Sequence, residues 1–376
     1  MVVGHSVTDN LFGAERSLLD VLAAVDRRSF DLSCVLPGGN AEYLRSVAEC
    51  TKNITVLPYR WWSRERPFDE ATVSRFESFF RSERVDLVHV NTMTLMDPLL
   101  AARRLELPGI LHARELLDQD RELAAHFGDD TAAILERIVT ASDFIIANSD
   151  STYRLYHKEG RSFRLYNCVD VDRFDLPNPL EPGKLKVGII SSNLPKKGIE
   201  SFVDLAVMAG RRRPELEFYA IGPRTEHIVR LEQRLRAEAG PVNLQFSGYV
   251  ANSVDAVRQV NVVVSLSLVA ESFGRTIAEA MAARRPVVAY DSGAVPELVR
   301  HGRDGFLVRQ PDLPKALEHL ETLADHADLV AEMGRNGWER ARQLFSPDVF
   351  ATQLNGIYRR VMDAWTVQAQ SRQSSA

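Results

Sequence analysis

Short runs of apolar, mostly β-branched residues alternate with amphipathic helical segments along almost the whole chain. The runs of the first half are Met1–Gly4, Leu32–Leu36, Ile54–Leu57, Asp86–Val90, Gly109–His112 and Phe144–Asn148. Between them lie segments such as Glu15–Val25, in which apolar residues recur at helical spacing. Continuously apolar strands separated by helices form parallel sheets that are covered on both faces. The alternation therefore predicts an α/β fold.

The same alternation returns in the second half of the chain. Its expected strands are Leu185–Ile190, Leu216–Ile221, Asn243–Phe246, Val262–Leu266 and Pro286–Tyr290. Between the halves, residues 169–184 contain several prolines and Gly183, and this density of helix and strand breakers indicates a linker. The chain is therefore expected to form two domains.

The predicted organisation is two Rossmann-like, doubly wound domains. Residues 1–168 form the N-terminal domain, and residues 185–346 form the C-terminal domain. A helix over residues 347–365 is expected to pack back on the N-terminal domain, and the polar residues 366–376 are expected to be a disordered tail. Ligands of doubly wound sheets bind beyond the carboxyl ends of the strands, so we expect both domains to face one interdomain cleft.

Composition argues against several other classes of protein. Lys and Arg total 46 and Asp and Glu total 51, whereas nucleic-acid-binding proteins usually have a strong basic surplus. The basic triplet Arg211–Arg213 ends an expected helix, where a solvated terminus is the simpler interpretation. Neither a signal peptide nor a membrane-spanning apolar run is visible. We expect a cytoplasmic protein without a nucleic-acid partner, and peripheral contact with a membrane stays open.

The stretch from Ser265 to Val299 contains the most informative residues. A strand ends near Leu266, a loop follows, and a helix begins near Arg275. Gly274 allows the backbone to approach a ligand closely. The free N–H groups and the dipole at a helix start favour an anion, and a pyrophosphate fits that description.

Two glutamates lie on either side of this helix start. Glu279 is about one turn into the helix, where a carboxylate is better suited to accept hydrogen bonds from a ribose diol than to lie beside phosphate. Glu271 is on the loop and could accept from the hydroxyls of a second sugar. Together with the phosphate-binding turn, the two carboxylates predict a nucleotide-sugar site.

These residues also resemble a known family. Glu271 and Glu279, with seven residues between them, match the E-x7-E motif of retaining GT-B glycosyltransferases, and the flanking sequences ESFGRTIAEAMA and PVVAYDSGAVPELV resemble the large GT4 family. The resemblance implies a GT-B fold, retention of anomeric configuration, no metal and no cofactor. The donor substrate would be a nucleoside diphosphate sugar, with UDP or GDP expected first. The implied donor-binding residues are Gly13, Ser272, Phe273, Gly274, Arg275, Thr276 and Glu279.

A second segment that resembles the family is Leu194–Gly198. It is similar to the loop whose lysine contacts the donor phosphates, and Lys197 is the residue that aligns. A cation there would stabilise the departing diphosphate as its charge develops. The family often has an arginine five residues earlier, where this chain has Ser192. Arg224 or Arg275 could compensate for the missing cation.

In the first half, Gly13 lies in a segment that resembles the family's glycine-containing loop, and His112 resembles its acceptor-side histidine. The resemblance thus implies His112, Glu271 and Lys197 as catalytic residues. Arg114 and Glu115, just after His112, are the implied acceptor-binding residues. A structural histidine that caps a loop is the alternative for His112.

Two other patterns are ambiguous. Asp170–Asp172 spells DxD, which holds a metal in other glycosyltransferases. It begins at the last residue of the segment Tyr166–Asp170, which resembles the family's linker signature and lies away from the phosphate loop, so no metal site is expected. The aromatic and basic residues Tyr59–Arg64 could stack on an acceptor sugar or touch an anionic membrane surface. Packing within the domain is the alternative.

The sequence therefore predicts a hexosyltransferase-like enzyme that moves a sugar from a nucleoside diphosphate sugar to a hydroxyl. The acceptor would be a carbohydrate, a lipid-linked sugar or a small molecule, in bacterial glycan or glycoconjugate biosynthesis. Retention could proceed on one face of the sugar or through a covalent carboxylate intermediate. The alternatives are a catalytically silent sugar-nucleotide-binding protein and a GT-B epimerase or phosphorylase.

Overall fold

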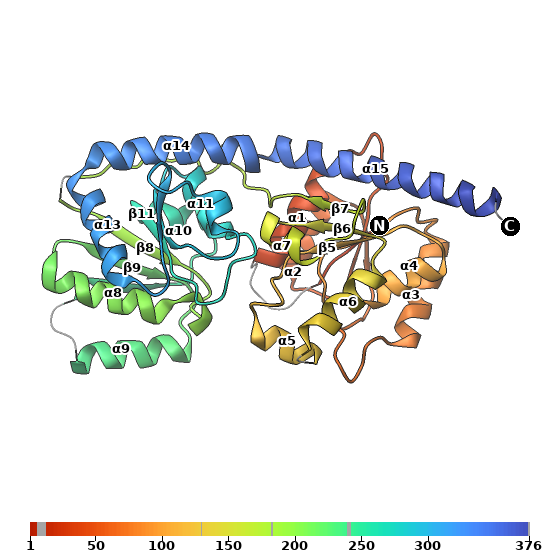
Figure 1. Ribbon diagram of the computed structural model, residues 1–376, viewed down its shortest axis with the longest axis horizontal. Helices are drawn as coiled ribbons and strands as arrows, with labels where there is room; N and C mark the ends of the chain where they lie inside the picture. Colours follow the sequence, from red (N-terminus) through yellow and green to blue (C-terminus); the bar gives the residue numbers. More distant parts are fainter. Residues whose placement is uncertain (6–12, 129, 182, 239–241, 375–376) are drawn as a thin grey trace. The chain divides into compact units, whose positions relative to one another are not determined.

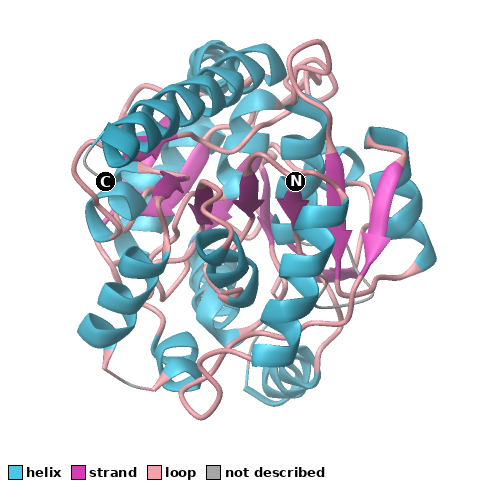
Figure 2. Cartoon of the chain, turned by 90° about the vertical axis from the view of Figure 1, so that its right-hand side faces the viewer, coloured by secondary structure: helices cyan, strands magenta, loops and turns pink. Residues whose placement is uncertain are grey.

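A computed structural model of the chain describes residues 1–5, 13–128, 130–181, 183–238 and 242–374 (Figure 1). The chain divides into two compact units, one of Met1–Cys168 with Pro347–Ala376 and the other of Val169–Ser346. Each unit contains one parallel sheet, and helices lie on both sides of the strands (Figure 2). The α/β fold expected from the alternation of strands and helices is confirmed.

The sheet of the first unit has the strand order β3-β2-β1-β4-β5-β6-β7. Its strands are β1 (Val2–Val3), β2 (Ser33–Leu36), β3 (Asn53–Val56), β4 (Val88–Val90), β5 (Gly109–Ala113), β6 (Phe144–Ala147) and β7 (Ser162–Arg164). Its helices are α1 (Gly13–Ala24), α2 (Ala41–Cys50), α3 (Glu70–Ser82), α4 (Asp97–Arg104), α5 (Arg121–Phe127), α6 (Thr131–Ala141), α7 (Asp150–Leu155) and α15 (Pro347–Ser374). The strand order reverses between β1 and β4, which makes their carboxyl ends a favourable place for a ligand.

Two hydrophobic cores cover the two faces of this sheet. One core joins the strands to α3, α4 and α6, and the other joins them to α1, α2 and α15. Leu354, Ile357 and Val361 of α15 are buried in the second core. Asn355 donates from Nδ2 to the Ala24 carbonyl at 2.8 Å and fixes α15 beside the end of α1. A helix far along the chain thus completes the core of the first unit.

The sheet of the second unit has the strand order β10-β9-β8-β11-β12-β13. Its strands are β8 (Lys186–Ile190), β9 (Glu217–Ile221), β10 (Leu244–Gly248), β11 (Val262–Ser265), β12 (Val287–Tyr290) and β13 (Gly305–Val308). Its helices are η1 (Pro195–Lys197), α8 (Ile199–Arg212), α9 (Glu226–Glu238), α10 (Ser253–Arg258), α11 (Arg275–Ala282), α12 (Val295–Leu298), α13 (Leu313–Asp325) and α14 (Ala327–Phe345). The order reverses between β8 and β11, so these two strands form the switch point of this sheet.

The end of the chain differs from the expectation. Residues 366–374 are the last turns of α15, where the sequence predicted a disordered tail. The residues from Val367 to Ser374 include neither glycine nor proline, and several are good helix formers. A helix that is already anchored by packing extends at little cost, because only nucleation is strongly unfavourable.

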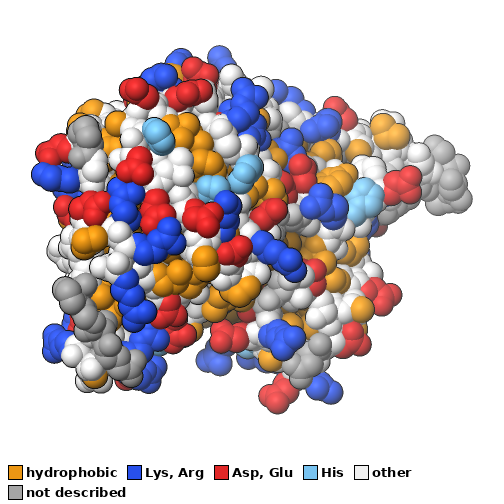
Figure 3. Space-filling view, turned by 60° about the vertical axis from the view of Figure 1, so that its left-hand side comes forward, with side chains coloured by type: hydrophobic (Ala, Val, Ile, Leu, Met, Phe, Trp, Pro, Cys, Tyr) orange, Lys and Arg blue, Asp and Glu red, His pale blue; other side chains and the backbone are white. Residues whose placement is uncertain are grey.

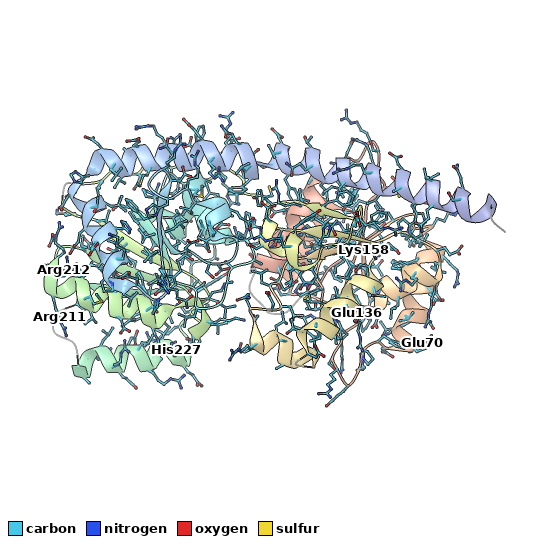
Figure 4. The ribbon with its side chains drawn as sticks, in the orientation of Figure 1. Glu70, Glu136, Lys158, Arg211, Arg212 and His227 are labelled. Carbon is cyan, nitrogen blue, oxygen red and sulfur yellow. The ribbon has the colours of Figure 1, made fainter. Side chains whose placement is uncertain are left out.

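The strongly basic triplet lies at the end of α8. Arg211 and Arg212 are labelled there in Figure 4. Arg212 forms an ion pair of 2.7 Å with Glu321, and Arg213 forms one of 2.8 Å with Asp325. Both acidic partners lie on α13. Two of the three arginines therefore pair with acidic residues of a neighbouring helix, as suits a solvated helix end.

Charged side chains of both signs are mixed over the face of the molecule seen in Figure 3. None of the helices in the described part of the chain combines the length and the apolar composition that a membrane-spanning helix needs.

Candidate functional site

The switch point of the second sheet brings two charged loops together. Lys197 ends η1, the short helix after β8, and Glu271 lies in the loop after β11. The Lys197 Nζ is 2.7 Å from the Glu271 Oε1. The Leu268 N–H donates to the Lys196 carbonyl at 2.9 Å and ties the same two loops through the backbone. Two of the residues implied by family resemblance, separated by 74 positions, are thus in direct contact.

Glu271 is held as a carboxylate. Burial alone would raise its pKa, but the charge of Lys197 and the hydrogen bonds from Lys197 and Ser267 outweigh burial, and the net shift is downward. The Ser267 hydroxyl donates to the same Oε1 as Lys197. Among the described residues, none donates a hydrogen bond to the other carboxylate oxygen of Glu271, Oε2. This oxygen is therefore available as an acceptor for ligand hydroxyls.

Two glycines allow the loops around Glu271 to pack closely. Gly198 has a φ of 73°, and a Cβ there would lie 1.8 Å from the Leu266 carbonyl oxygen. Gly293, which follows β12, has a φ of 60°, and its Cβ would lie 2.4 Å from the Glu271 carbonyl oxygen. The next residue, Ala294, donates its N–H to that same carbonyl at 2.8 Å. The position of Glu271 is therefore determined by backbone contacts that tolerate no side chain.

The helix start expected near Arg275 is present. Gly274 adopts a left-handed conformation with φ 86° and ψ 60°, and α11 begins at the next residue. Arg275 donates from Nε to the Glu279 Oε1 at 3.2 Å, one turn further along the helix. Glu279 is only 3% exposed. The start of α11 and the two carboxylates expected around it thus belong to one small region.

The side chains next to this turn have different environments. Ser272 and Thr276 are half-buried, whereas the Phe273 ring is 1% exposed. That ring packs edge-to-face against Phe345 with centroids 5.4 Å apart. Phe273 therefore anchors the loop to α14, and its backbone is the part that could meet a ligand.

The arginines that could replace the cation missing at Ser192 both have acidic partners. Arg275 pairs with Glu279, and Arg224 pairs with Glu232 of α9 through both of its terminal nitrogens. Lys197 is likewise paired with Glu271. In this structure each candidate phosphate-binding cation is thus matched by a carboxylate.

In the first unit, the candidate residues lie at the carboxyl end of β5. His112 is fully buried, and its Nδ1 is 3.0 Å from Arg114 Nη2 and 3.2 Å from His89 Nε2. Arg114 is 9% exposed and also donates to Asn91 and Asn167. His112 and Arg114 are therefore part of one hydrogen-bonded cluster.

Glu115 is hydrogen-bonded to the loop that follows β4. Its Oε1 accepts from the Thr92 hydroxyl at 3.0 Å, and its Oε2 accepts from the Arg114 N–H at 3.0 Å. Burial raises its pKa despite these hydrogen bonds. Gly13 is the first residue of α1, and a Cβ there would meet no atom of the described residues within 4 Å. The residues before Gly13, from 6 to 12, lie outside the described part of the chain.

The aromatic and basic segment Tyr59–Arg64 contains both buried and half-buried aromatic residues. Tyr59 and Trp62 are buried, and Trp62 stacks on Phe127 with centroids 4.2 Å apart. Trp61 is half-buried and lies edge-on to His5 and His126. Packing within the unit accounts for most of this loop.

Sequence reasoning missed three residues of the His112 cluster. Asn91 follows β4, His89 lies on β4, and Tyr358 is on α15. The Tyr358 hydroxyl lies 2.6 Å from His89 Nδ1. Nothing in the local sequence of β4 or α15 connects them to His112, because only the folded sheet and the packing of α15 make them neighbours.

No group of three or more His, Cys, Asp or Glu side chains in the described residues is arranged to hold a metal ion. Asp170 and Asp172, the residues of the DxD pattern, are part of this described region.

Two protein-family models match the chain. The model described as Glycosyltransferase Family 4 matches residues 13–173, and the model described as Glycosyl transferases group 1 matches residues 184–326. The two matches follow each other along the chain and correspond to its two halves.

Curated proteins with similar sequences are also glycosyltransferases or sugar synthases. The D-inositol 3-phosphate glycosyltransferase of Streptomyces avermitilis is 29% identical over 70% of this chain and 63% of its own length. The trehalose synthase of Thermococcus litoralis is 27% identical over 46% of this chain and 43% of its own length. The chain thus matches only part of the length of either relative.

Solved structures with a similar fold cover nearly the whole chain. HepE of Anabaena in complex with UDP and glucose has a TM-score of 0.77 and 20% identity, with 96% of this chain and 99% of that chain covered. Sucrose-phosphate synthase of Thermosynechococcus elongatus has a TM-score of 0.74 and 16% identity, with 96% and 99% covered. The chain belongs to the GT4-like glycosyltransferase family and has the GT-B fold.

Proposed function

We propose that the protein is a retaining, metal-independent glycosyltransferase that uses a nucleoside diphosphate sugar. The acceptor is a hydroxyl of a carbohydrate, a lipid-linked sugar or a small molecule, in bacterial glycan or glycoconjugate biosynthesis. The observation that most directly supports the proposal is the contact of Lys197 with Glu271 beside the start of α11, at the switch point of a parallel sheet.

Donor recognition follows from the chemistry of this region. The amides of Gly274, Arg275 and Thr276 bind the diphosphate at the helix start. Lys197 adds a positive charge where the leaving group gains negative charge. Glu279 accepts from the ribose hydroxyls, and Glu271 accepts from hydroxyls of the transferred sugar.

Binding of the donor requires an exchange of partners. A diphosphate competes with Glu271 for Lys197, and the sugar hydroxyls replace the ammonium as donors to the Glu271 carboxylate. Because the lowered pKa keeps Glu271 ionised, it remains an acceptor throughout this exchange. The Lys197–Glu271 pair is thus a preformed arrangement of the two charges that the donor needs.

Transfer on one face of the sugar fits these residues. The glycosidic bond to the diphosphate breaks, the acceptor oxygen forms the new bond on the same face, and a departing phosphate oxygen takes the acceptor proton. Lys197 and the α11 amides stabilise the charge of the leaving diphosphate. Exclusion of water is needed, because hydrolysis of the donor competes with transfer.

The proposal is tested first by thermal denaturation with UDP, GDP, ADP and TDP sugars, because a ligand that binds the folded state raises the melting temperature. One base is expected to give a clear shift. The matching donor is then incubated with candidate acceptors, with product mass by mass spectrometry and anomeric configuration by NMR. An inverted product, or activity abolished by EDTA and restored by a divalent cation, would contradict retention or metal independence.

A silent binding protein gives a different result in the same assay. It would show the thermal shift but would release no nucleoside diphosphate when the acceptor is added. An enzyme releases the diphosphate in proportion to the sugar transferred. If no nucleotide sugar shifts the melting temperature, the proposed donor site is wrong.

A further inference from the structure

Arg114 determines which atoms its neighbours present to the rest of the site. Its guanidinium can only donate hydrogen bonds. Nη2 donates to Asn91 Oδ1 at 2.9 Å and to His112 Nδ1 at 3.0 Å, and Nε donates to the same Asn91 oxygen at 3.2 Å. Nη1 donates to Asn167 Oδ1. Every neighbour in these contacts must therefore turn an acceptor toward Arg114.

This requirement removes two ambiguities. An asparagine amide can be placed in either of two orientations, but at Asn91 the oxygen must face Arg114, so Nδ2 points away as a donor. A neutral histidine has one donor and one acceptor nitrogen. At His112 the acceptor must be Nδ1, and the proton is consequently on Nε2.

The same reasoning determines the proton positions of His89 on β4 and Tyr358 on α15. His89 Nε2 is 3.2 Å from His112 Nδ1, which is already an acceptor, so His89 Nε2 must be the donor. His89 Nδ1 is then an acceptor, and the Tyr358 hydroxyl donates to it at 2.6 Å. The protons of Tyr358, His89 and His112 thus point in one direction, set by the guanidinium at the other end.

The imidazoles of His112 and His89 are neutral. Burial, the charge of Arg114 and the neighbouring His89 hold the pKa of His112 well below its ordinary value. Burial and the charge of Arg114 lower the pKa of His89 to about 3. A protonated ring would also lose the acceptor that Arg114 requires.

Two of the resulting donors have no partner in the described part of the chain. Asn91 Nδ2 and His112 Nε2 are both buried, and neither forms a hydrogen bond with any described residue. Leaving a buried donor unsatisfied costs about 1–3 kcal/mol. Asn91 and His112 both contact Arg114 Nη2, so the two residues lie close together at the carboxyl ends of β4 and β5.

We propose that Arg114 is a positioning residue that presents His112 Nε2–H and Asn91 Nδ2–H as hydrogen-bond donors to hydroxyl oxygens of a bound sugar. His89 and Tyr358 complete the arrangement from the other side of His112. The role in sugar binding rests on the proposed function. His112 then orients a substrate hydroxyl by donating to it and does not act as a general base.

The proton positions are tested without any substrate. The protein is labelled with 15N in its histidines, and the His112 signals are assigned by their loss in His112→Leu. The wild-type protein is expected to show a protonated Nε2 and an unprotonated Nδ1. A proton on Nδ1, or a doubly protonated ring at neutral pH, would overturn the proposal even if the protein proves to be no glycosyltransferase.

The role of Arg114 itself is tested in Arg114→Met. Without the guanidinium, the hydrogen bonds from His112 through His89 to Tyr358 can run in either direction, so a mixture of the two His112 tautomers is expected. The near-UV circular dichroism of the variant shows whether it is folded. A folded variant that retains only the Nε2–H form would show that Arg114 does not set the proton.

The donor role is tested by paired variants in the transfer assay. Asn91→Asp keeps an oxygen for Arg114 but replaces the free donor by an acceptor. Asn167→Asp adds the same charge beside the same guanidinium and leaves Asn91 intact. Asn91→Asp is expected to lower kcat/KM roughly tenfold or more relative to Asn167→Asp. Equal losses in the two variants would refute the Asn91 donor.

His112 is compared in the same way. His112→Gln keeps an N–H donor near the position of Nε2, whereas His112→Leu removes it. Gln is expected to retain roughly tenfold more activity than Leu if donation is what matters. If both variants are equally inactive while the wild-type spectrum shows the Nε2 proton, the assigned role in substrate orientation is wrong.

Discussion

The Nζ of Lys197 lies 2.7 Å from the Oε1 of Glu271 and joins the loop after β8 to the loop after β11. These loops meet at the point where the strand order of the second sheet reverses. The pair combines the cation proposed for the diphosphate with the carboxylate proposed for the sugar. In the absence of a ligand, the two charges therefore pair with each other. The proposed donor would replace this pairing with its phosphates and its sugar hydroxyls.

We expect Lys197→Met to change the dependence of stability on pH. The pKa of Glu271 is lowered from its ordinary value of 4.5 in the folded state. A carboxyl group whose pKa is lowered by folding stabilises the folded protein at pH values above its pKa in the unfolded state. This stabilisation is lost as the pH falls through the pKa of the folded state. In the variant, burial acts on Glu271 without the opposing ammonium, so this acid-sensitive contribution should shrink or reverse its sign.

The measurement is the denaturation midpoint of both proteins without ligand between pH 3 and pH 8. Lys197→Met should lower the free energy of unfolding by roughly 1–2 kcal/mol at neutral pH, because Glu271 is mostly buried and Lys197 is partly exposed. This loss should diminish in acid, where Glu271 becomes protonated. Lys315→Met serves as the control, because Lys315 pairs with Glu318 while half of each side chain is exposed. A constant difference across the pH range would contradict the Glu271 assignment.

Glu279→Gln should weaken donor binding. The amide keeps the size of the side chain but removes the charge and one acceptor for the ribose hydroxyls, and it loosens the 3.2 Å contact with Arg275. The dissociation constant of the donor nucleotide, measured by calorimetry, is expected to rise by about tenfold. Glu226→Gln, an exposed glutamate of α9, should leave it unchanged. Unaltered affinity in Glu279→Gln would exclude the ribose role.

Gly198→Ala should destabilise the second unit far more than Gly302→Ala. Both glycines have a φ near 74°, so alanine is strained at either position by about 1 kcal/mol. Only at Gly198 would the Cβ also collide with backbone, 1.8 Å from the Leu266 carbonyl oxygen, whereas Gly302 has open space. The melting temperature should fall modestly for Gly302→Ala and steeply for Gly198→Ala. Similar melting temperatures would mean that the β8 and β11 loops are not packed as described.

Tyr358→Phe should destabilise the first unit. The substitution removes the hydroxyl that donates to His89 Nδ1 at 2.6 Å and leaves a buried acceptor unsatisfied, which costs about 1–3 kcal/mol. Tyr153→Phe is the control, since Tyr153 is half-buried and its contact in this structure is with the His157 ring. Urea denaturation of the two variants measures the difference, and equal midpoints would contradict the Tyr358–His89 hydrogen bond.

Most of the strands that sequence analysis located have apolar runs. β8 and β12, for example, differ from the expected ranges by one residue at their first ends. β7 and β13 were not predicted. β7 is the short polar run Ser162–Arg164 at the edge of its sheet, and edge strands need less apolar sequence because one side faces no further strand. The run Gly305–Val308 of β13 begins with a glycine and is only four residues long.

The residues of the candidate donor site could be named from the sequence because they are local. Glu271, Gly274 and Glu279 lie within a single strand-loop-helix unit, whose turn and helix start follow from short-range preferences. The sequence by itself thus determined the α/β architecture and the chemistry of this segment, since both depend on periodicity and on neighbours along the chain.

Only the tertiary structure decided which distant residues meet. The contact of Lys197 with Glu271 depends on β8 and β11 being adjacent in the sheet, and no local pattern specifies strand order. The proton positions at His112 depend on Arg114, His89 and a tyrosine of the last helix. Such contacts arise from the packing of whole elements, which is why neither composition nor spacing could reveal them.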